Sequence, residues 1–62
     1  MKANEVIKLL TECGWSEVRQ SGSHKIFKHL ENHNNIVVPF HGNKDLKKGT
    51  LNDILKKAGL KP

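Results

Sequence analysis

The sequence predicts an α+β fold of order α-β-β-β-α, in which two helices cover one face of a three-stranded antiparallel sheet. Two observations predict it. Apolar residues recur at helical spacing near both ends of the chain, and the middle holds three short extended segments separated by turn signals. Because consecutive strands usually pair as neighbours, the three segments form a meander. The two amphipathic helices then pack on one face and leave the other open to solvent.

The first element is a helix expected over Ala3 to Cys13, because its apolar side chains fall on one helical face. These side chains are Val6, Ile7, Leu10 and Cys13. Gly14 follows, and glycine suits the left-handed residue that ends many helices. Asn4 and Glu5 place polar and acidic groups near the positive end of the helix dipole. Asn4 is also a candidate N-cap, which leaves the first residue of the helix open.

Two strands joined as a hairpin follow this helix. The first is expected from Trp15 to Gln20 and the second from His24 to His29, with Ser21-Gly22-Ser23 as the turn. Trp15 comes directly after the helix cap, where we expect it to belong to the core rather than to stack on a base.

A second turn and a third strand complete the predicted sheet. Leu30 to Asn35 is polar and rich in asparagine, so we expect it to be the turn. Ile36 to Val38 is β-branched and predicts the strand. Pro39 ends the strand, because proline cannot donate to a sheet ladder.

The last element is a helix whose apolar residues follow the i, i+3, i+4, i+7 pattern. They are Leu51, Ile54, Leu55 and Ala58. Gly59 ends this helix. Its start is open, because Asp45 or Lys47 could precede it and Thr50 with Asp53 resembles a capping box.

The chain has 62 residues, so we expect one domain over residues 1–62. A fold of this size buries about 60% of the surface that its unfolded chain exposes. We therefore expect no deep, walled active site. Any chemistry must lie on an open surface, which favours a polymeric substrate over a small metabolite.

Charge and cysteine usage narrow the partner and the compartment. Lys and Arg number 11 against 6 Asp and Glu, for a formal charge of +5, which favours polyanionic partners such as nucleic acids. The single Cys13 excludes an internal disulfide framework and fits a reducing compartment. No apolar run is long enough to span a bilayer and no signal-peptide pattern begins the chain. These features predict a cytoplasmic protein.

Strand alternation predicts a basic patch on the open side of the sheet. If Val18 and Phe27 face the helices, the intervening side chains point the other way. The open side then carries Glu17, Arg19, His24, Ile26 and Lys28. The opposite register buries Ile26 and turns His24 inward. We expect the first register.

The hairpin from Arg19 to His24 holds the side chains that carry the strongest chemical signal. Cleavage of an RNA phosphodiester needs a group that removes the 2′-OH proton, donors for the phosphate charge and a proton for the leaving oxygen. Histidine titrates near neutral pH and can do either proton transfer. Arg19 and the N–H groups of the turn can hold a phosphate. The alternative interpretation is an ordinary polar hairpin with an exposed histidine.

Two further clusters have weaker functional interpretations. Lysines 44, 47 and 48 precede the last helix and are either phosphate contacts or a solvated helix entry. The other histidines raise the possibility of zinc, which three histidines can hold. They are His29, His33 and His41. Because a second cysteine and a His-Glu-x-x-His helix are both missing from the sequence, we predict no metal site.

Several short blocks, in order, resemble the HicA family of messenger-RNA interferases. They are Gly14-Trp15, Arg19-Gln20, Gly22-Ser23-His24 with Phe27, Val38-Pro39-Phe40-His41, Lys47-Lys48-Gly49-Thr50-Leu51, Ile54-Leu55 and Ala58-Gly59-Leu60. The resemblance implies a fold like a double-stranded-RNA-binding domain. It also implies a toxin of a type II toxin–antitoxin system that cleaves RNA with one key histidine, matched by His24, and is neutralised by a HicB-type antitoxin. Ala3-Asn4 stands where such toxins often have a serine cap.

The sequence therefore predicts a metal-independent endoribonuclease without cofactors, in which His24 is the general base or acid. Its proton partner is water, the substrate or His41. The residues expected to bind RNA are Arg19, Gln20, Ser21, Gly22, Ser23, Lys25, Lys28, Lys47 and Lys48. Two other functions fit the same fold: a non-catalytic RNA-binding module, and an interaction protein whose basic face docks an acidic partner.

Overall fold

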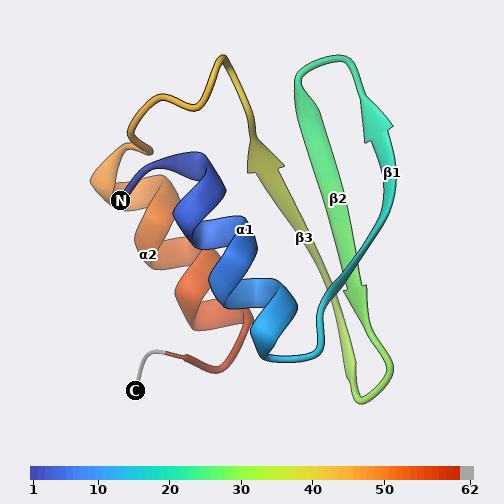
Figure 1. Ribbon diagram of the computed structural model, residues 1–62. Helices are drawn as coiled ribbons and strands as arrows, with labels where there is room; N and C mark the ends of the chain where they lie inside the picture. Colours follow the sequence, from blue (N-terminus) through green and yellow to red (C-terminus); the bar gives the residue numbers. More distant parts are fainter. Residues whose placement is uncertain (61–62) are drawn as a thin grey trace.

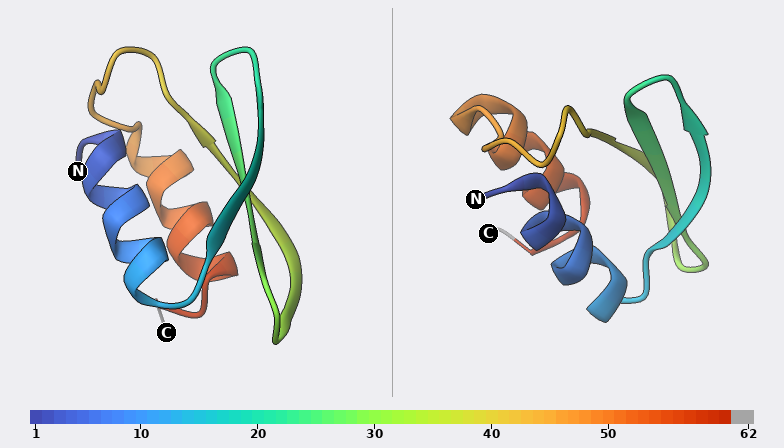
Figure 2. Two further views of the ribbon diagram at one scale, coloured as in Figure 1. Left: turned by 45° about the vertical axis from the view of Figure 1, so that its right-hand side comes forward. Right: turned by 45° about the horizontal axis from the view of Figure 1, so that its top comes forward.

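The computed structural model describes residues 1–60 and confirms the predicted element order. Helix α1 (Ala3–Glu12) is followed by strands β1 (Ser16–Ser21), β2 (His24–His29) and β3 (Asn32–Pro39), and then by helix α2 (Lys48–Lys57). The strands form one antiparallel sheet in the order β1-β2-β3. Both helices lie on the same side of this sheet (Figure 1), and the two turned views in Figure 2 agree.

Both helices end as the glycines predict. Gly14 has φ +93°, and the N–H of Trp15 beyond it donates to the carbonyl of Leu10, which closes a Schellman motif. Helix α2 ends in the same way at Gly59, where φ is +74°. Neither helix within residues 1–60 is long and apolar enough to cross a membrane.

The structure resolves the start of α1, which the sequence left open. Lys2 is the N-cap, and its backbone N–H donates to the Glu5 carboxylate at 2.8 Å. Asn4 lies inside the helix, where its N–H donates to Oδ1 of Asn43 at 2.9 Å. Of the starts that the sequence left open, Asn4 is therefore not the N-cap, and its own N–H is satisfied by a side chain from a distant loop.

The start of α2 resolves the alternatives left open by the sequence. Lys47 is the N-cap, with extended backbone, and the helix begins at Lys48. Thr50 is already within the first helical turn, so the capping box proposed for Thr50 and Asp53 is wrong. Asp45 lies before the helix and pairs in an isolated β-bridge with Lys2.

Strand β3 is longer than its β-branched residues indicate. It begins at Asn32, so the expected turn over Leu30 to Asn35 shortens to residues 30–31. The Asn32 side chain accepts the N–H of Asn34 at 2.8 Å and donates to the carbonyl of Lys57 at 3.1 Å. Asparagine has low strand propensity, which is why the sequence places Asn32 in a turn. Its hydrogen bond to the end of α2 fixes the side chain, and this contact extends the strand.

The core lies between the sheet and the two helices. Trp15 and Phe27 are 2% and 1% exposed, which confirms Trp15 as a core residue. The other buried side chains are Ala3, Val6, Leu10, Ile36, Val38 and Ile54. Partly buried side chains of both helices pack around them. The helical patterns read from the sequence therefore point at the sheet, as expected.

A β-bulge in β1 changes the predicted faces of that strand. Phe27 pairs with Glu17 and Ile26 pairs with Arg19, so Val18 is the extra residue. Paired side chains in an antiparallel sheet lie on the same face, which puts Glu17 on the helix side with Phe27. The prediction that Val18 faces the helices is wrong, because it is 50% exposed, and so is the placement of Glu17 on the open side. Arg19 keeps its predicted side.

Candidate active site

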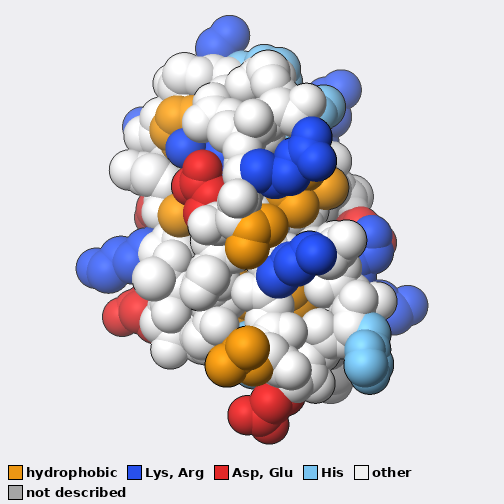
Figure 3. Space-filling model, turned by 90° about the vertical axis from the view of Figure 1, so that its right-hand side faces the viewer, with side chains coloured by type: hydrophobic (Ala, Val, Ile, Leu, Met, Phe, Trp, Pro, Cys, Tyr) orange, Lys and Arg blue, Asp and Glu red, His pale blue; other side chains and the backbone are white. Residues whose placement is uncertain are grey.

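The face of the sheet that the helices leave uncovered is called here the open face. The strand register assigns to it Arg19, Ser21, His24, Ile26, Lys28, Val37 and Pro39. It faces the viewer in Figure 3, where hydrophobic side chains lie between positively charged ones across the middle. This side of the molecule thus combines cations, a histidine and exposed apolar groups such as Val37, which is 45% exposed.

His24 lies at one end of this face, beside the β1–β2 turn. It is the first residue of β2 and pairs with Ser21 on β1 and with Pro39 on β3. Its side chain is exposed. Gly22 in the turn has φ +59°, and a Cβ added there would meet no atom within 4 Å. The turn is therefore open enough for a substrate backbone to approach the His24 ring.

The two predicted basic partners of His24 lie at different distances along the sheet. Arg19 pairs with Ile26, two residues along β2 from His24, or about 7 Å at the usual rise per residue. Lys28 is four residues along β2, or about 13 Å away. Both are exposed. Arg19 can thus reach the group on which His24 acts, whereas Lys28 can contact only a more distant part of a long substrate.

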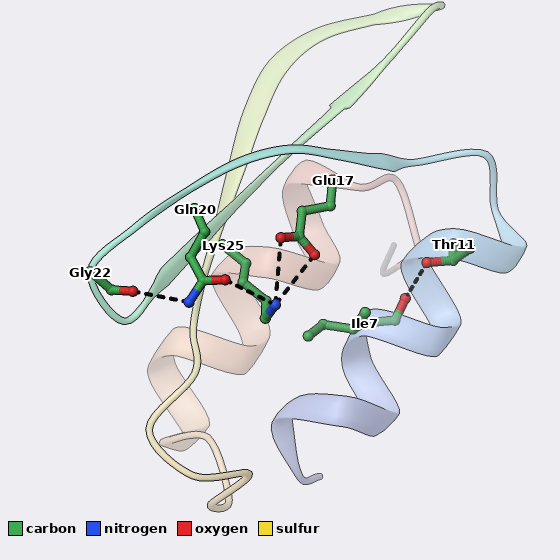
Figure 4. Close-up of polar contacts among 6 residues, drawn as sticks. All are labelled: Ile7, Thr11, Glu17, Gln20, Gly22 and Lys25. Atoms are coloured by element: carbon green, nitrogen blue, oxygen red, sulfur yellow. Dashed lines mark hydrogen bonds and ion pairs between the residues drawn. The ribbon is translucent and has the colours of Figure 1, made fainter.

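Gln20 and Lys25 do not lie on the open face. They pair with one another across β1 and β2, on the helix side. The Lys25 ammonium lies 3.4 Å from the Glu17 carboxylate and 3.3 Å from Oε1 of Gln20, and Gln20 donates to the carbonyl of Gly22 at 3.0 Å (Figure 4). Lys25 also sits 5.3 Å from the centre of the Phe40 ring. These contacts therefore support the β1–β2 turn from the helix side of the sheet.

Lys47 and Lys48 lie away from the open face, at the start of α2. Lys48 is exposed, and Lys47 lines a surface cavity of about 430 Å³. The cavity is bounded by Pro39, His41, Lys44, Asp45, Leu46, Lys47 and Thr50. It therefore connects the predicted lysine cluster to the end of β3, close to where His24 pairs.

A second histidine lies next to His24. The rings of His24 and His41 are 6.3 Å apart between centroids and nearly perpendicular, at 83°. Nε2 of His41 is 3.4 Å from the Ser23 hydroxyl, and the neighbouring Phe40 N–H donates to the Ser23 carbonyl at 2.7 Å. From the sequence alone, His41 was only one of three candidate proton partners of His24. The signal that finds it is the strand register, which sets His24 beside Pro39.

The remaining histidines do not form the metal site considered from the sequence. Nδ1 of His29 accepts the Glu31 N–H at 3.0 Å, so its proton is on Nε2, which donates to the Cys13 carbonyl at 3.1 Å. His29 also packs on Trp15, with ring centroids 5.2 Å apart. His33 is exposed on β3. Within residues 1–60, no three histidine, cysteine or acidic side chains come together as a metal-ligand group.

Comparison with known proteins identifies the family of this chain. A family model described as the HicA toxin of bacterial toxin–antitoxin systems matches residues 3–60. No curated protein matches the chain. The match spans both helices and all three strands, and it includes the hairpin with His24 and the loop with His41. The chain therefore belongs to the HicA toxin family.

Proposed function

We propose that this toxin is an endoribonuclease that cleaves messenger RNA, with His24 as a proton-transfer group at the scissile phosphate. The observation that carries the proposal is an exposed histidine at the open end of an uncovered, positively charged sheet face. Toxins of the HicA family are generally ribonucleases, and a toxin of this kind acts inside its own cell under the control of an antitoxin.

The chemistry follows from what an RNA strand carries. The 2′-OH is a nucleophile built into the substrate, so the protein has only to move protons and stabilise the phosphate. An exposed imidazole can take the 2′-OH proton or protonate the leaving 5′ oxygen near neutral pH. Arg19 lies close enough along the sheet to neutralise charge on the phosphate, and Arg can bind it in a bidentate manner. We expect no metal ion in this mechanism.

Substrate and antitoxin compete for the same surface in this proposal. Arg19 and Lys28 hold the RNA backbone along the open face, while Ser21 and the Gly22-Ser23 turn contact the reacting phosphate. Lys47 and Lys48 contact a phosphate further along the chain. A HicB-type antitoxin neutralises the toxin by covering the open face, because its charge and exposed apolar groups suit an acidic partner with apolar anchors.

The test replaces His24 and compares it with a second exposed histidine. His24→Ala should lower the rate of cleavage of labelled RNA by about 10²–10⁴-fold, as expected for loss of one general acid or base. His33→Ala should cleave as the parent does, because His33 lies at the other end of the sheet. Circular dichroism of both variants checks that each is folded.

The products and conditions provide further readouts. The 2′-OH mechanism predicts a 2′,3′-cyclic phosphate or its opened product, no cleavage of all-deoxy substrate and persistence of activity in EDTA. Cleavage of DNA, or normal RNA cleavage by folded His24→Ala, would contradict the assignment. A parent protein that retains RNA on a filter without cleaving it would instead be a non-catalytic RNA-binding module.

A further inference from the structure

His41 is brought to the proposed site by two separate contacts. The hydrogen bond from the Phe40 N–H to the Ser23 carbonyl joins the end of β3 to the β1–β2 turn. The Ser23 hydroxyl, 3.4 Å from Nε2 of His41, then restrains the ring itself. As a result the His24 and His41 rings lie with centroids 6.3 Å apart, although they come from a strand and a distant loop.

We propose that His41 is a second catalytic residue, which exchanges a proton with the same phosphodiester from the side opposite His24. This inference rests on the proposed ribonuclease function. A general acid or base must come within about 2.6–3.2 Å of the oxygen that it serves. Rings held 6.3 Å apart are too far for a direct hydrogen bond, but a phosphate group placed between them can receive one from each.

The proton balance requires one proton acceptor and one proton donor, and the two histidines can supply them. One neutral imidazole accepts the 2′-OH proton while the 2′ oxygen forms a bond to phosphorus. The bond from phosphorus to the 5′ oxygen breaks, and the other histidine, as imidazolium, gives that oxygen its proton. The products are a 2′,3′-cyclic phosphate and a free 5′-OH. The two histidines have then exchanged protonation states, and proton exchange with water restores them.

The cavity beside His41 supports the placement of substrate there. Lys44 and Lys47 line it together with His41, and both are exposed. Their positive charges attract the phosphate that follows or precedes the scissile one. An RNA strand that runs from Arg19 on the open face into this cavity passes close to the rings of His24 and His41.

The first experiment measures cleavage of ordinary RNA by His41→Ala and His33→Ala. His41→Ala should lower kcat by about 10²–10⁴-fold with a much smaller change in KM, because the lost group acts in the transition state. His33→Ala should be unchanged. Because the His41 side chain is exposed, its truncation leaves no buried cavity. Circular dichroism of His41→Ala, and of a second variant, His41→Asn, checks the fold.

The second readout separates catalysis from support of the fold. In a substrate with sulfur in place of the bridging 5′ oxygen, the leaving group is a thiolate. It needs no proton from the enzyme, because thiols are far more acidic than alcohols. If the two histidines divide the roles, this substrate restores cleavage in either His24→Ala or His41→Ala, whichever variant lacks the general acid. Rescue of neither variant, or of both, overturns the proposal.

The pH dependence gives an independent check. The parent kcat/KM should rise and then fall with pH, since one histidine must be neutral and the other charged. His41→Ala should lose one of these limbs. The charged groups facing His41 are His24 on β2 and Lys44, Asp45 and Lys47 around the cavity. The limb that His41→Ala removes identifies the proton transfer in which His41 acts.

These outcomes distinguish the two proposals. If folded His24→Ala cleaves RNA normally, the proposed function itself fails. If His24→Ala is inactive but His41→Ala keeps the parent rate and both pH limbs, the ribonuclease assignment stands and the two-histidine site is overturned.

Discussion

His24 and His29 begin and end the same strand, yet their surroundings give them different roles. His24 is exposed beside an open turn, whereas His29 is half-buried and uses both ring nitrogens for structure. Its Nε2 bonds to the carbonyl of Cys13 at the end of α1, and its ring packs on Trp15. His29 therefore joins α1 to the β2–β3 hairpin, and Gly14 allows this because it presents no side chain to the ring.

Gly14→Ala should destabilise the protein for two reasons. A residue with φ +93° strains any L side chain, and a Cβ at this position would lie 2.7 Å from Nε2 of His29. The His29 ring must then move, which weakens its hydrogen bond to the Cys13 carbonyl. The free energy of unfolding should therefore fall by about 2–3 kcal/mol. Urea unfolding followed by tryptophan fluorescence, which reports Trp15 next to the ring, measures it.

Gly59→Ala is the matched control for this substitution. Gly59 also follows a helix with positive φ, at +74°, but an added Cβ there meets no atom within 4 Å. It should lose only the backbone contribution, about 1 kcal/mol. Equal losses in the two variants would show that the His29 contact contributes nothing.

At the scale of secondary-structure elements, the bulge in β1 determines which side chains reach the open face. If Val18 took a regular place in the ladder instead of bulging, strict alternation would put Glu17 on the same side as Arg19. With Val18 as the bulged residue, Glu17 faces the helix side and pairs with the Lys25 ammonium, while Arg19 stays on the open face. The bulge therefore keeps a carboxylate off the face proposed to bind RNA, where it would repel phosphates.

Deletion of Val18 should leave the register of the hairpin intact. The pairs on either side of the bulge, Glu17 with Phe27 and Arg19 with Ile26, would become consecutive in a regular ladder. Because Val18 is 50% exposed, the free energy of unfolding should change by about 1 kcal/mol or less. NMR contacts across the Glu17–Phe27 and Arg19–Ile26 pairs measure the register.

Deletion of Gln20 is the control for this change. It moves Arg19 opposite Lys25 and turns the guanidinium to the helix side, since a one-residue shift reverses the faces of a strand. The deletion of Gln20 should therefore impair RNA cleavage, whereas the deletion of Val18 should not. If both deletions preserved cleavage, the side on which Arg19 lies would not matter for activity.

At the scale of the whole molecule, the two-layer arrangement leaves one face of the sheet uncovered by the helices. The open face holds Arg19 and Lys28 together with the apolar Ile26 and Val37, on a chain of formal charge +5. Charges of one sign on such a face speed the capture of an oppositely charged partner, and apolar contacts lengthen its stay. Because we propose that RNA and the antitoxin both bind this face, we expect the antitoxin to inhibit by occluding it.

Amide hydrogen exchange with antitoxin added should show where the antitoxin binds. We expect protection over residues 21–28, and cleavage should fall in proportion to occupancy. The association rate should fall by about tenfold or more as salt is raised from low ionic strength, because charge attraction accelerates encounter. Protection confined to the two helices, with residues 21–28 still exchanging, would contradict occlusion and require an indirect mechanism.

Two double variants with the same net charge separate local from overall charge. Arg19→Glu with Lys28→Glu should slow antitoxin association more than Lys8→Glu with Lys56→Glu, although both pairs lower the formal charge equally. Lys8 and Lys56 are exposed on α1 and α2, away from the open face. Equal slowing in the two would show that overall charge, rather than the open face, attracts the antitoxin.

The sequence by itself determined the element order, both helix ends and the core-facing side of each helix. These follow from local physics: apolar periodicity selects the buried face, and glycine tolerates the positive φ that ends a helix. It also singled out His24 as a candidate, because histidine can transfer protons near neutral pH and because Gly22-Ser23-His24 resembles the HicA motif. Residues near one another in the chain were enough for each of these predictions.

Only the tertiary structure decided which side chains meet across the fold. The bulge at Val18 depends on how β1 fits β2, and the early start of β3 depends on the contact of Asn32 with the end of α2. The pairing of His24 with Pro39 brings His41 beside it, and no local pattern encodes that approach. Strand register is set by packing of the whole sheet on its helices, which is why the second histidine emerges only from the folded molecule.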